Sequence, residues 1–331
     1  MRTIKLSLLG LAIALIAGLG LAQSAQAITL IPPSLEFNVK PGDPPIQTKV
    51  KLFNETAEPV QMYAATALFT AKDESGVPAF ITDQPVEGLA SWIKIAAGPF
   101  PLQPGERVEI PVEITVPANA DPGGHFAGIL FSPQAPADDA QVAITSKVGT
   151  LILVRVAGEV RESATVASFG TETGKTQYNR LPIELAARIQ NSGNVHIRPN
   201  GNITIRNMLG GTTVVLPVNS VQGAVLPASV RKFTAVWEKT ALTGKSNFFS
   251  EFGREWKNFA LGPYTATLSL TYGQNNDKTL NSSYQFFVFP WRVLLLSVII
   301  IILAIWLIMF SVKRYNRWVI AKAAQQSHPK K

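Results

Sequence analysis

The chain of 331 residues contains no cysteine. This absence excludes a disulfide framework, a thiolate zinc site and a thiol nucleophile. Because secreted animal and plant proteins of this size usually carry disulfides, it also favours a bacterial cell envelope. Phosphate-binding loops and dinucleotide-binding fingerprints are missing as well, so we expect no cofactor.

Acidic residues are missing from both ends of the chain. All 22 lie between Glu36 and Asp277, where they face 21 lysines and arginines, so this long segment has a net charge of −1. The net charge of +8 arises from Arg2 and Lys5 at the start and from seven basic residues beginning at Arg292. The basic excess therefore belongs to the ends, and nothing in the charge supports nucleic-acid binding.

The N-terminal residues have the organisation of a secretory signal peptide. Arg2 and Lys5 precede an apolar stretch from Leu6 to Leu21. Residues 25–27 (Ala-Gln-Ala) then form a small-x-small cleavage site. We expect residues 1–27 to be removed and the mature chain to begin at Ile28.

Near the C-terminus, Val293 to Val312 is a run of 20 residues without a charged side chain. At about 1.5 Å per residue, a helix of this length crosses the ~30 Å hydrocarbon core of a bilayer. The alternative is a buried core helix, but such helices rarely run so far without a polar face. We therefore expect a transmembrane helix over residues 291–313, with the bilayer as a partner.

The charges beside this run predict its orientation. Lys313, Arg314 and Arg317 follow it, no acidic residue occurs after them, and only Arg292 lies on the other flank. Lysine and arginine collect on the cytoplasmic side of spanning helices. We expect a single-pass plasma-membrane protein with a basic cytoplasmic tail over residues 314–331 and its N-terminal domains outside the cytoplasm.

The exported segment has the pattern of an all-β protein. Ile46 to Phe53 alternates apolar and polar residues and ends in Asn54-Glu55-Thr56. Similar runs are Val60 to Phe69, Val108 to Val116, Phe126 to Phe131 and Val148 to Val156. Such period-2 alternation between turn residues predicts antiparallel sandwiches with one buried face per sheet.

The second half repeats this plan. Leu181 to Ile189 is followed by Asn191-Ser192-Gly193-Asn194, much as Phe53 is followed by Asn54. Late in each half, at residues 124–130 and 262–268, a strand begins with a glycine that is followed two positions later by an aromatic residue. We expect two tandem immunoglobulin-like β-sandwich domains, residues 28–160 and 161–290.

Short turn motifs carry a resemblance to a known family. They are Lys40-Pro41-Gly42, Asn54, the run Asp121-Pro122-Gly123-Gly124-His125-Phe126-Ala127-Gly128, Asn191-Ser192-Gly193-Asn194 and Pro199-x-Gly201. With the signal peptide, two domains, spanning helix and basic tail, the chain resembles the WxL-interacting protein family of Gram-positive cell surfaces. The resemblance implies a first domain that binds peptidoglycan and a second that binds a partner or host ligand.

Residues for catalysis or metal binding are scarce. Ser132, His125 and Asp121 can be drawn as a triad, but no Gly-x-Ser-x-Gly elbow supports it. Asp138-Asp139 lacks the further oxygen ligands that calcium requires. We expect no catalytic site and no metal site, and a hydrolase using His125 is the less favoured alternative.

One segment of the second domain breaks the β pattern. Residues 246–259 place aromatic side chains on one side of a helix and charged side chains on the other. The aromatic residues are Phe248, Phe249, Phe252, Trp256 and Phe259. Ser246 suits the N-cap position and Gly262-Pro263 stops the helix, which predicts a helical insertion.

Two interpretations of this helix are open. In the first, it packs its aromatic residues onto the sandwich as a crossover helix. In the second, it lies near the membrane, because the connection between the fifth and sixth strands is at the end where the last strand leaves an immunoglobulin-like sandwich. That strand, Tyr284 to Phe289, leads directly to Trp291. Aromatic side chains favour the headgroup boundary, so the helix would contact lipid or a membrane-embedded partner.

These features predict a membrane-anchored binding or scaffold protein that engages the cell wall, other surface proteins, or both. A polar segment, Pro133 to Lys147, is a candidate ligand-facing loop. The alternative is a chaperone or assembly factor for exported proteins, since pilus chaperones also pair two such sandwiches. An unpaired strand edge lined with apolar side chains would favour the alternative.

Overall fold

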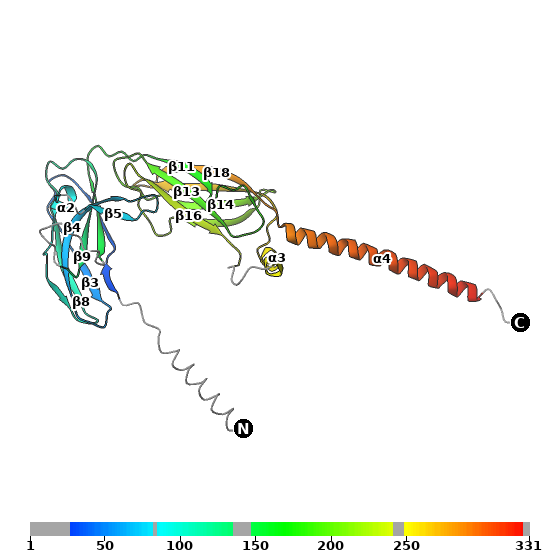
Figure 1. Ribbon diagram of the computed structural model, residues 1–331. Helices are drawn as coiled ribbons and strands as arrows, with labels where there is room; N and C mark the ends of the chain where they lie inside the picture. The colour runs from blue at the N-terminus through cyan, green and yellow to red at the C-terminus, as the bar shows by residue number, and fades with distance from the viewer. Residues whose placement is uncertain (1–26, 82–84, 135–146, 241–247, 327–331) are drawn as a thin grey trace, which may run out of the picture. The chain divides into compact units, whose positions relative to one another are not determined.

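The computed structural model describes residues 27–81, 85–134, 147–240 and 248–326 (Figure 1). The predicted signal peptide, Asp138-Asp139 and the predicted cap Ser246 lie outside these residues. The chain divides into two compact units. The first comprises the residues up to Lys72, Val77–Arg161 and Gly193–Val195, and the second comprises Asp73–Gly76, Glu162–Ser192 and His196 onward.

The first unit is a sandwich of two sheets. One sheet has the strand order β1 (Ile28–Ile31), β3 (Ile46–Asn54), β8 (Arg107–Ile114) and β6 (Ile93–Lys94). The other has the order β2 (Ser34–Val39), β10 (Val148–Val156), β9 (Gly123–Ser132), β4 (Val60–Ala71) and β5 (Pro78–Ile81), with β7 (Phe100–Leu102) also paired to β4. The short helix α2 (Gly88–Trp92) contributes Leu89 to the core.

The alternation along β3 shows how the sequence produces this core. Val50 and Leu52 are fully buried between the sheets, while Lys49 and Lys51 face solvent. Successive side chains of a strand point to opposite faces, so each apolar residue reaches the core and each lysine remains hydrated. The predicted strands of this half are confirmed.

The second unit is also a sandwich. Its smaller sheet has the order β11 (Ala164–Thr171), β13 (Ile183–Asn191) and β16 (Val230–Trp237). Its larger sheet has the order β12 (Gln177–Tyr178), β18 (Lys278–Val288), β17 (Gly262–Tyr272), β14 (Asn200–Asn207) and β15 (Thr212–Val218). The helix α3 (Phe248–Lys257) lies between β16 and β17 in the chain. The fold is therefore all-β with two immunoglobulin-like sandwiches, as predicted.

One feature differs from a purely antiparallel sandwich. In the first unit β2 pairs with the last strand, β10, in parallel, and in the second unit β12 pairs with the last strand, β18, in parallel. In the first unit the chain passes from β1, in one sheet, to β2, in the other. When the chain crosses to the other sheet, the strand that follows the crossing lies beside the last strand and runs in the same direction. Alternation of apolar residues along the sequence does not reveal this parallel pairing.

The turn residues behind the family resemblance have structural roles. The Asn54 side chain is fully buried and donates hydrogen bonds to the carbonyl oxygens of Glu58 (2.8 Å) and Leu102 (3.1 Å). At the equivalent strand end of the second unit, buried Asn191 donates to the carbonyl oxygen of Val225 (2.9 Å). Each side chain supplies partners to buried backbone groups where a strand ends.

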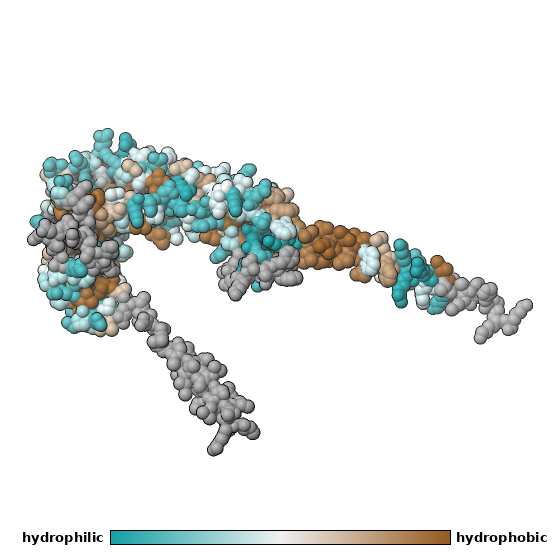
Figure 2. Space-filling model, in the orientation of Figure 1, coloured by the Kyte–Doolittle hydropathy of each residue, from teal (hydrophilic) through white to brown (hydrophobic). Residues whose placement is uncertain are grey.

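The C-terminal helix α4 runs from Trp291 to Gln326. It is therefore longer than the predicted span of residues 291–313, and part of the predicted tail is helical. Its section Trp291–Ile320 is, within the described residues, the one helix long and apolar enough to cross a membrane. Figure 2 shows its brown apolar stretch giving way to teal farther along the helix. Lys313, Arg314 and Arg317, which follow the apolar run, are exposed.

A carboxylate on the first sandwich gives a pH prediction. Hydrogen bonds from Lys49 and Lys51 on the neighbouring strand lower the pKa of Glu109 from 4.5 to about 2. A lowered pKa in the folded state means that the stabilisation is present above pH 4.5 and is lost as the pH falls toward 2. In thermal unfolding of the detergent-solubilised chain, the wild type should have a higher midpoint temperature than Glu109→Gln at pH 6, and this difference should shrink strongly as the pH falls toward 2. A difference that does not change with pH would contradict the prediction.

Candidate functional site

Helix α3 has an inverted amphipathic arrangement. Glu251 and Glu255 of the helix and Asn258, which directly follows it, are buried, with exposed fractions of 9%, 0% and 0%. Spacings of four and three residues place these side chains on one face. Trp256 and Phe259 point away, with exposed fractions of 63% and 38%. The first interpretation, in which the aromatic residues pack onto the sandwich, is therefore wrong for Trp256 and Phe259.

The remaining aromatic residues complete this picture. Phe252 is half-buried, and its ring stacks on that of Trp256 with centroids 6.4 Å apart and an interplanar angle of 27°. The side chains of Phe248 and Phe249 lie outside the described part of the structure, although both residues belong to α3. The exposed face of α3 is thus the face that carries Trp256.

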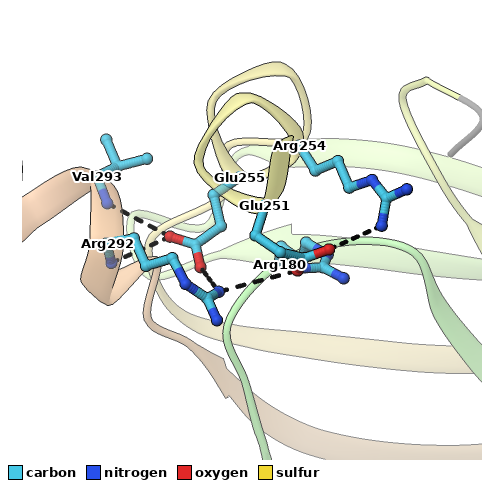
Figure 3. A network of polar contacts seen from close by, with 6 residues as sticks. All are labelled: Arg180, Glu251, Arg254, Glu255, Arg292 and Val293. Atoms are coloured by element: carbon cyan, nitrogen blue, oxygen red, sulfur yellow. Dashed lines mark hydrogen bonds and ion pairs between the residues drawn. The ribbon is translucent and has the colours of Figure 1, made fainter. Parts of the chain in front are cut away.

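The buried Glu255 carboxylate connects α3 to the start of α4 (Figure 3). It accepts a hydrogen bond from the Arg292 guanidinium at 2.6 Å, and it accepts the backbone N–H groups of Arg292 at 3.1 Å and Val293 at 3.3 Å. The first N–H groups of a helix have no partner within the helix, and they form its positive end. A carboxylate from a different helix therefore caps the candidate membrane helix.

A second carboxylate extends this network. Glu251 forms ion pairs with Arg180 and with Arg254, the latter at 2.7 Å, and lies 3.9 Å from the Arg292 guanidinium (Figure 3). Arg180 comes from the connection between β12 and β13, so three segments distant in sequence meet here. The five side chains comprise two carboxylates and three guanidinium groups. We call Arg180, Glu251, Arg254, Glu255 and Arg292 the junction network.

The end of α3 is held in a similar way. The buried Asn258 side chain accepts the backbone N–H of Thr240 at 3.0 Å. Lys239, which follows β16, donates to the carbonyl oxygen of Phe259. These contacts join the end of α3 to the exit of β16, so the helix is fixed to the sandwich at both its polar face and its C-terminus.

Sequence reasoning placed Glu251 and Glu255 opposite the aromatic residues but did not predict that they are buried. It used Arg292 only as a flanking charge. A charged residue in the first turn of an apolar run, together with two glutamates four residues apart on a nearby helix, is the signal that could have pointed to this contact. The partners lie 37 positions apart, so no local pattern joins them.

The first unit has an apolar pocket of about 390 Å³. Its lining residues are Pro33, Pro78, Phe80, Leu130, Lys147, Gly149 and Leu151. Strand β10 pairs with β9 from Val148 onward, but with β2 only from Leu151 onward. Within the described residues, Val148 and Gly149 therefore have a strand partner on one side only, and the pocket lies beside this half-open edge.

The residues drawn as a triad do not meet. His125 and Ser132 both lie on β9, seven positions apart, which corresponds to roughly 23 Å along a strand. The His125 ring donates to the backbone carbonyl of Asp121 at 2.8 Å, and it packs 4.7 Å from the Trp92 ring. The Ser132 hydroxyl donates to the carbonyl of Gln134. Across the described residues, no group of three His, Asp or Glu side chains is arranged to hold a metal ion.

Comparisons with known proteins add fold likenesses only. No protein-family model matches the chain, and a search of curated proteins found no match. Among solved structures, the class 5 fimbriae chaperone CfaA matches with a TM-score of 0.37 and 11% identity over 78% of this chain and 98% of that chain. The E. coli chaperone DraB matches with a TM-score of 0.32 and 12% identity over 80% and 98%. The YadV chaperone has a TM-score of 0.34, with 9% identity over 78% and 99%. With such low scores, these likenesses carry no argument about function.

Proposed function

We propose that this chain is a single-pass membrane protein whose extracytoplasmic immunoglobulin-like domains bind segments of other exported proteins. The observation that carries the proposal is the apolar pocket beside the half-open edge of β10. The candidate membrane helix α4, which the junction network ties to the second sandwich, supplies the anchor. Catalysis has no part in this proposal.

The chemistry of the pocket favours a polypeptide. A strand edge offers backbone N–H and C=O groups to an added extended segment, and a pocket next to it receives an alternate side chain of that segment. Six of the seven lining residues are apolar or glycine, and Lys147 is the charged one. A glycan site needs several polar groups to orient hydroxyls, so this pocket suits an aliphatic or aromatic side chain better than a sugar.

The test uses the full chain in lipid nanodiscs and a library of biotinylated twelve-residue peptides with alternating apolar side chains. Leu151→Asp places a charge in the pocket and should weaken binding at least tenfold, about 1.4 kcal/mol. Val215→Asp, on an edge strand of the second unit and 50% exposed, is the matched control and should bind as the wild type does. Equal binding by wild type and Leu151→Asp would remove the pocket from the proposal, provided that both unfold at the same temperature.

The two forms of this function differ in the state of the bound protein. A scaffold binds folded surface proteins, whereas a chaperone or assembly factor binds exported proteins before they fold. Suppression of the aggregation of an unfolded exported protein, lost in Leu151→Asp, would support the chaperone form. The wall-binding role implied by the family resemblance stays a prediction, and salt-resistant retention of the full chain on cell-wall sacculi is the measurement that checks it.

A further inference from the structure

We infer that the exposed face of α3 is a membrane-contacting surface, seated in the lipid headgroup boundary of the bilayer that α4 crosses. The surface consists of Phe252 and Trp256 of α3 and of Phe259, which lies just after the helix. It rests on α4 spanning a membrane, and it does not depend on the binding of any exported protein.

The junction network determines the level of α3 relative to the bilayer. Glu255 is bonded directly to the first turn of α4, through the backbone N–H groups of Arg292 and Val293. The uncharged run of α4 begins at Val293. Because α3 contacts the helix where its apolar run starts, it lies at the boundary between hydrocarbon and water rather than far from the membrane.

The side chains on the two faces of α3 agree with that level. A surface helix in water normally buries apolar residues and exposes charged ones. In α3 the glutamates are inside, while the Trp256 ring is 63% exposed and stacks on Phe252. Tryptophan and phenylalanine are favoured at the headgroup region, where the ring is partly desolvated. A lipid surface is therefore the environment that this exposed face fits.

Other exposed apolar residues lie at the same end of the second sandwich. The register pairs Asn207 with Tyr264 and Gly262 with Val288, which brings the β14–β15 turn to the end where β18 leads into α4. The turn exposes Met208 and Leu209 by 69% and 87%. Leu261, Phe287, Phe289 and Trp291 are also exposed there, by 43%, 39%, 47% and 39%. In Figure 2 the brown stretch of α4 begins directly at this end. An apolar rim around the start of a membrane helix is what a bilayer surface covers.

The absence of cysteine permits a direct test, because one introduced cysteine is labelled uniquely. The full chain is reconstituted in vesicles with an environment-sensitive fluorophore at one of three sites: Trp256→Cys on α3, Leu303→Cys within α4, or Val221→Cys. Val221 is 83% exposed and follows β15, whose last residue pairs with Gly201 at the opposite end of the sheet. Quenching is measured with lipids that carry a nitroxide at the headgroup or deep in the acyl chain.

The label at position 256 should lose most of its emission with headgroup nitroxides. The label at position 303 should lose most of its emission with nitroxides deep in the acyl chain. The label at position 221 should be quenched by neither. A label at 256 that behaves like the one at 221, while 303 is quenched, would overturn the inference. If the label at position 256 reports an apolar environment but is quenched by neither lipid, the surface contacts protein and the inference is equally wrong. Loss of quenching at 303 would instead refute the anchor on which both proposals depend.

Discussion

Replacing Glu255 with alanine is expected to lower the free energy of unfolding of the second unit by about 3–5 kcal/mol. The carboxylate is fully buried and is the acceptor for three donors at the start of α4. Removing it leaves the Arg292 guanidinium, whose side chain is only 21% exposed, without its nearest counter-charge. It also leaves two helix N–H groups without an acceptor, each of which is unfavourable when water is excluded.

The measurement is chemical unfolding of the full chain in detergent micelles, followed by near-ultraviolet circular dichroism. Glu238→Ala removes an exposed glutamate of the same unit and should change the stability by no more than about 0.5 kcal/mol. Hydrogen exchange at the amides of Arg292 and Val293 should accelerate in Glu255→Ala only. A Glu255→Ala variant as stable as Glu238→Ala would show that the junction network does not hold α3 and α4 together.

A paired replacement separates charge from packing. Substituting both Glu255→Met and Arg292→Met removes two opposite charges together and fills the space with apolar atoms. Buried ion pairs replaced in this way often lose little stability, whereas removal of one partner is strongly destabilising. The double variant should therefore recover the part of the loss that comes from the unpaired Arg292 charge, while the two N–H groups of α4 stay without an acceptor.

The second large effect is expected in the core of the same sandwich. Trp237 is 2% exposed, and its ring packs against those of Tyr264 and Phe286 with centroids 4.9 Å and 6.0 Å away. Trp237→Ala removes a large apolar side chain and leaves a cavity, so we expect a loss of about 3–5 kcal/mol. The same unfolding measurement checks it.

Val236 is the matched control for this prediction. It precedes Trp237 on β16 but points to the opposite face and is 46% exposed. Val236→Ala should cost less than about 1 kcal/mol. Similar losses for the two variants would mean that the ring cluster is not the centre of the core, whatever the burial of its members.

The sequence predicted the parts of this fold that follow a local pattern. Period-2 alternation located β3, β4 and β10 within a few residues, and the uncharged run from Val293 located the apolar part of α4. The parallel pairing of β2 with β10 was missed because it depends on a strand changing sheets, which side-chain alternation does not record.

The candidate site was predicted less completely for a related reason. Helical spacing separated the aromatic from the charged side of α3, but spacing cannot say which side faces the protein. That choice was decided by Arg180 and Arg292, which reach α3 from two distant segments. An amphipathic helix normally buries its apolar side, and the two arginines reverse this by neutralising the buried glutamates.

The capping of α4 by Glu255 also has a consequence within the bilayer. A lone spanning helix on a flexible linker turns freely about its long axis, but this helix is held by its side chain and two backbone donors at one carboxylate. The rotation of α4 about its axis is therefore fixed relative to the second sandwich. One residue inserted after Val293, beyond the capped turn, would rotate every later side chain of α4 by about 100° relative to that sandwich. If α4 crosses a bilayer as proposed, the stripe of α4 that meets a neighbour there is set by the fold of the second sandwich.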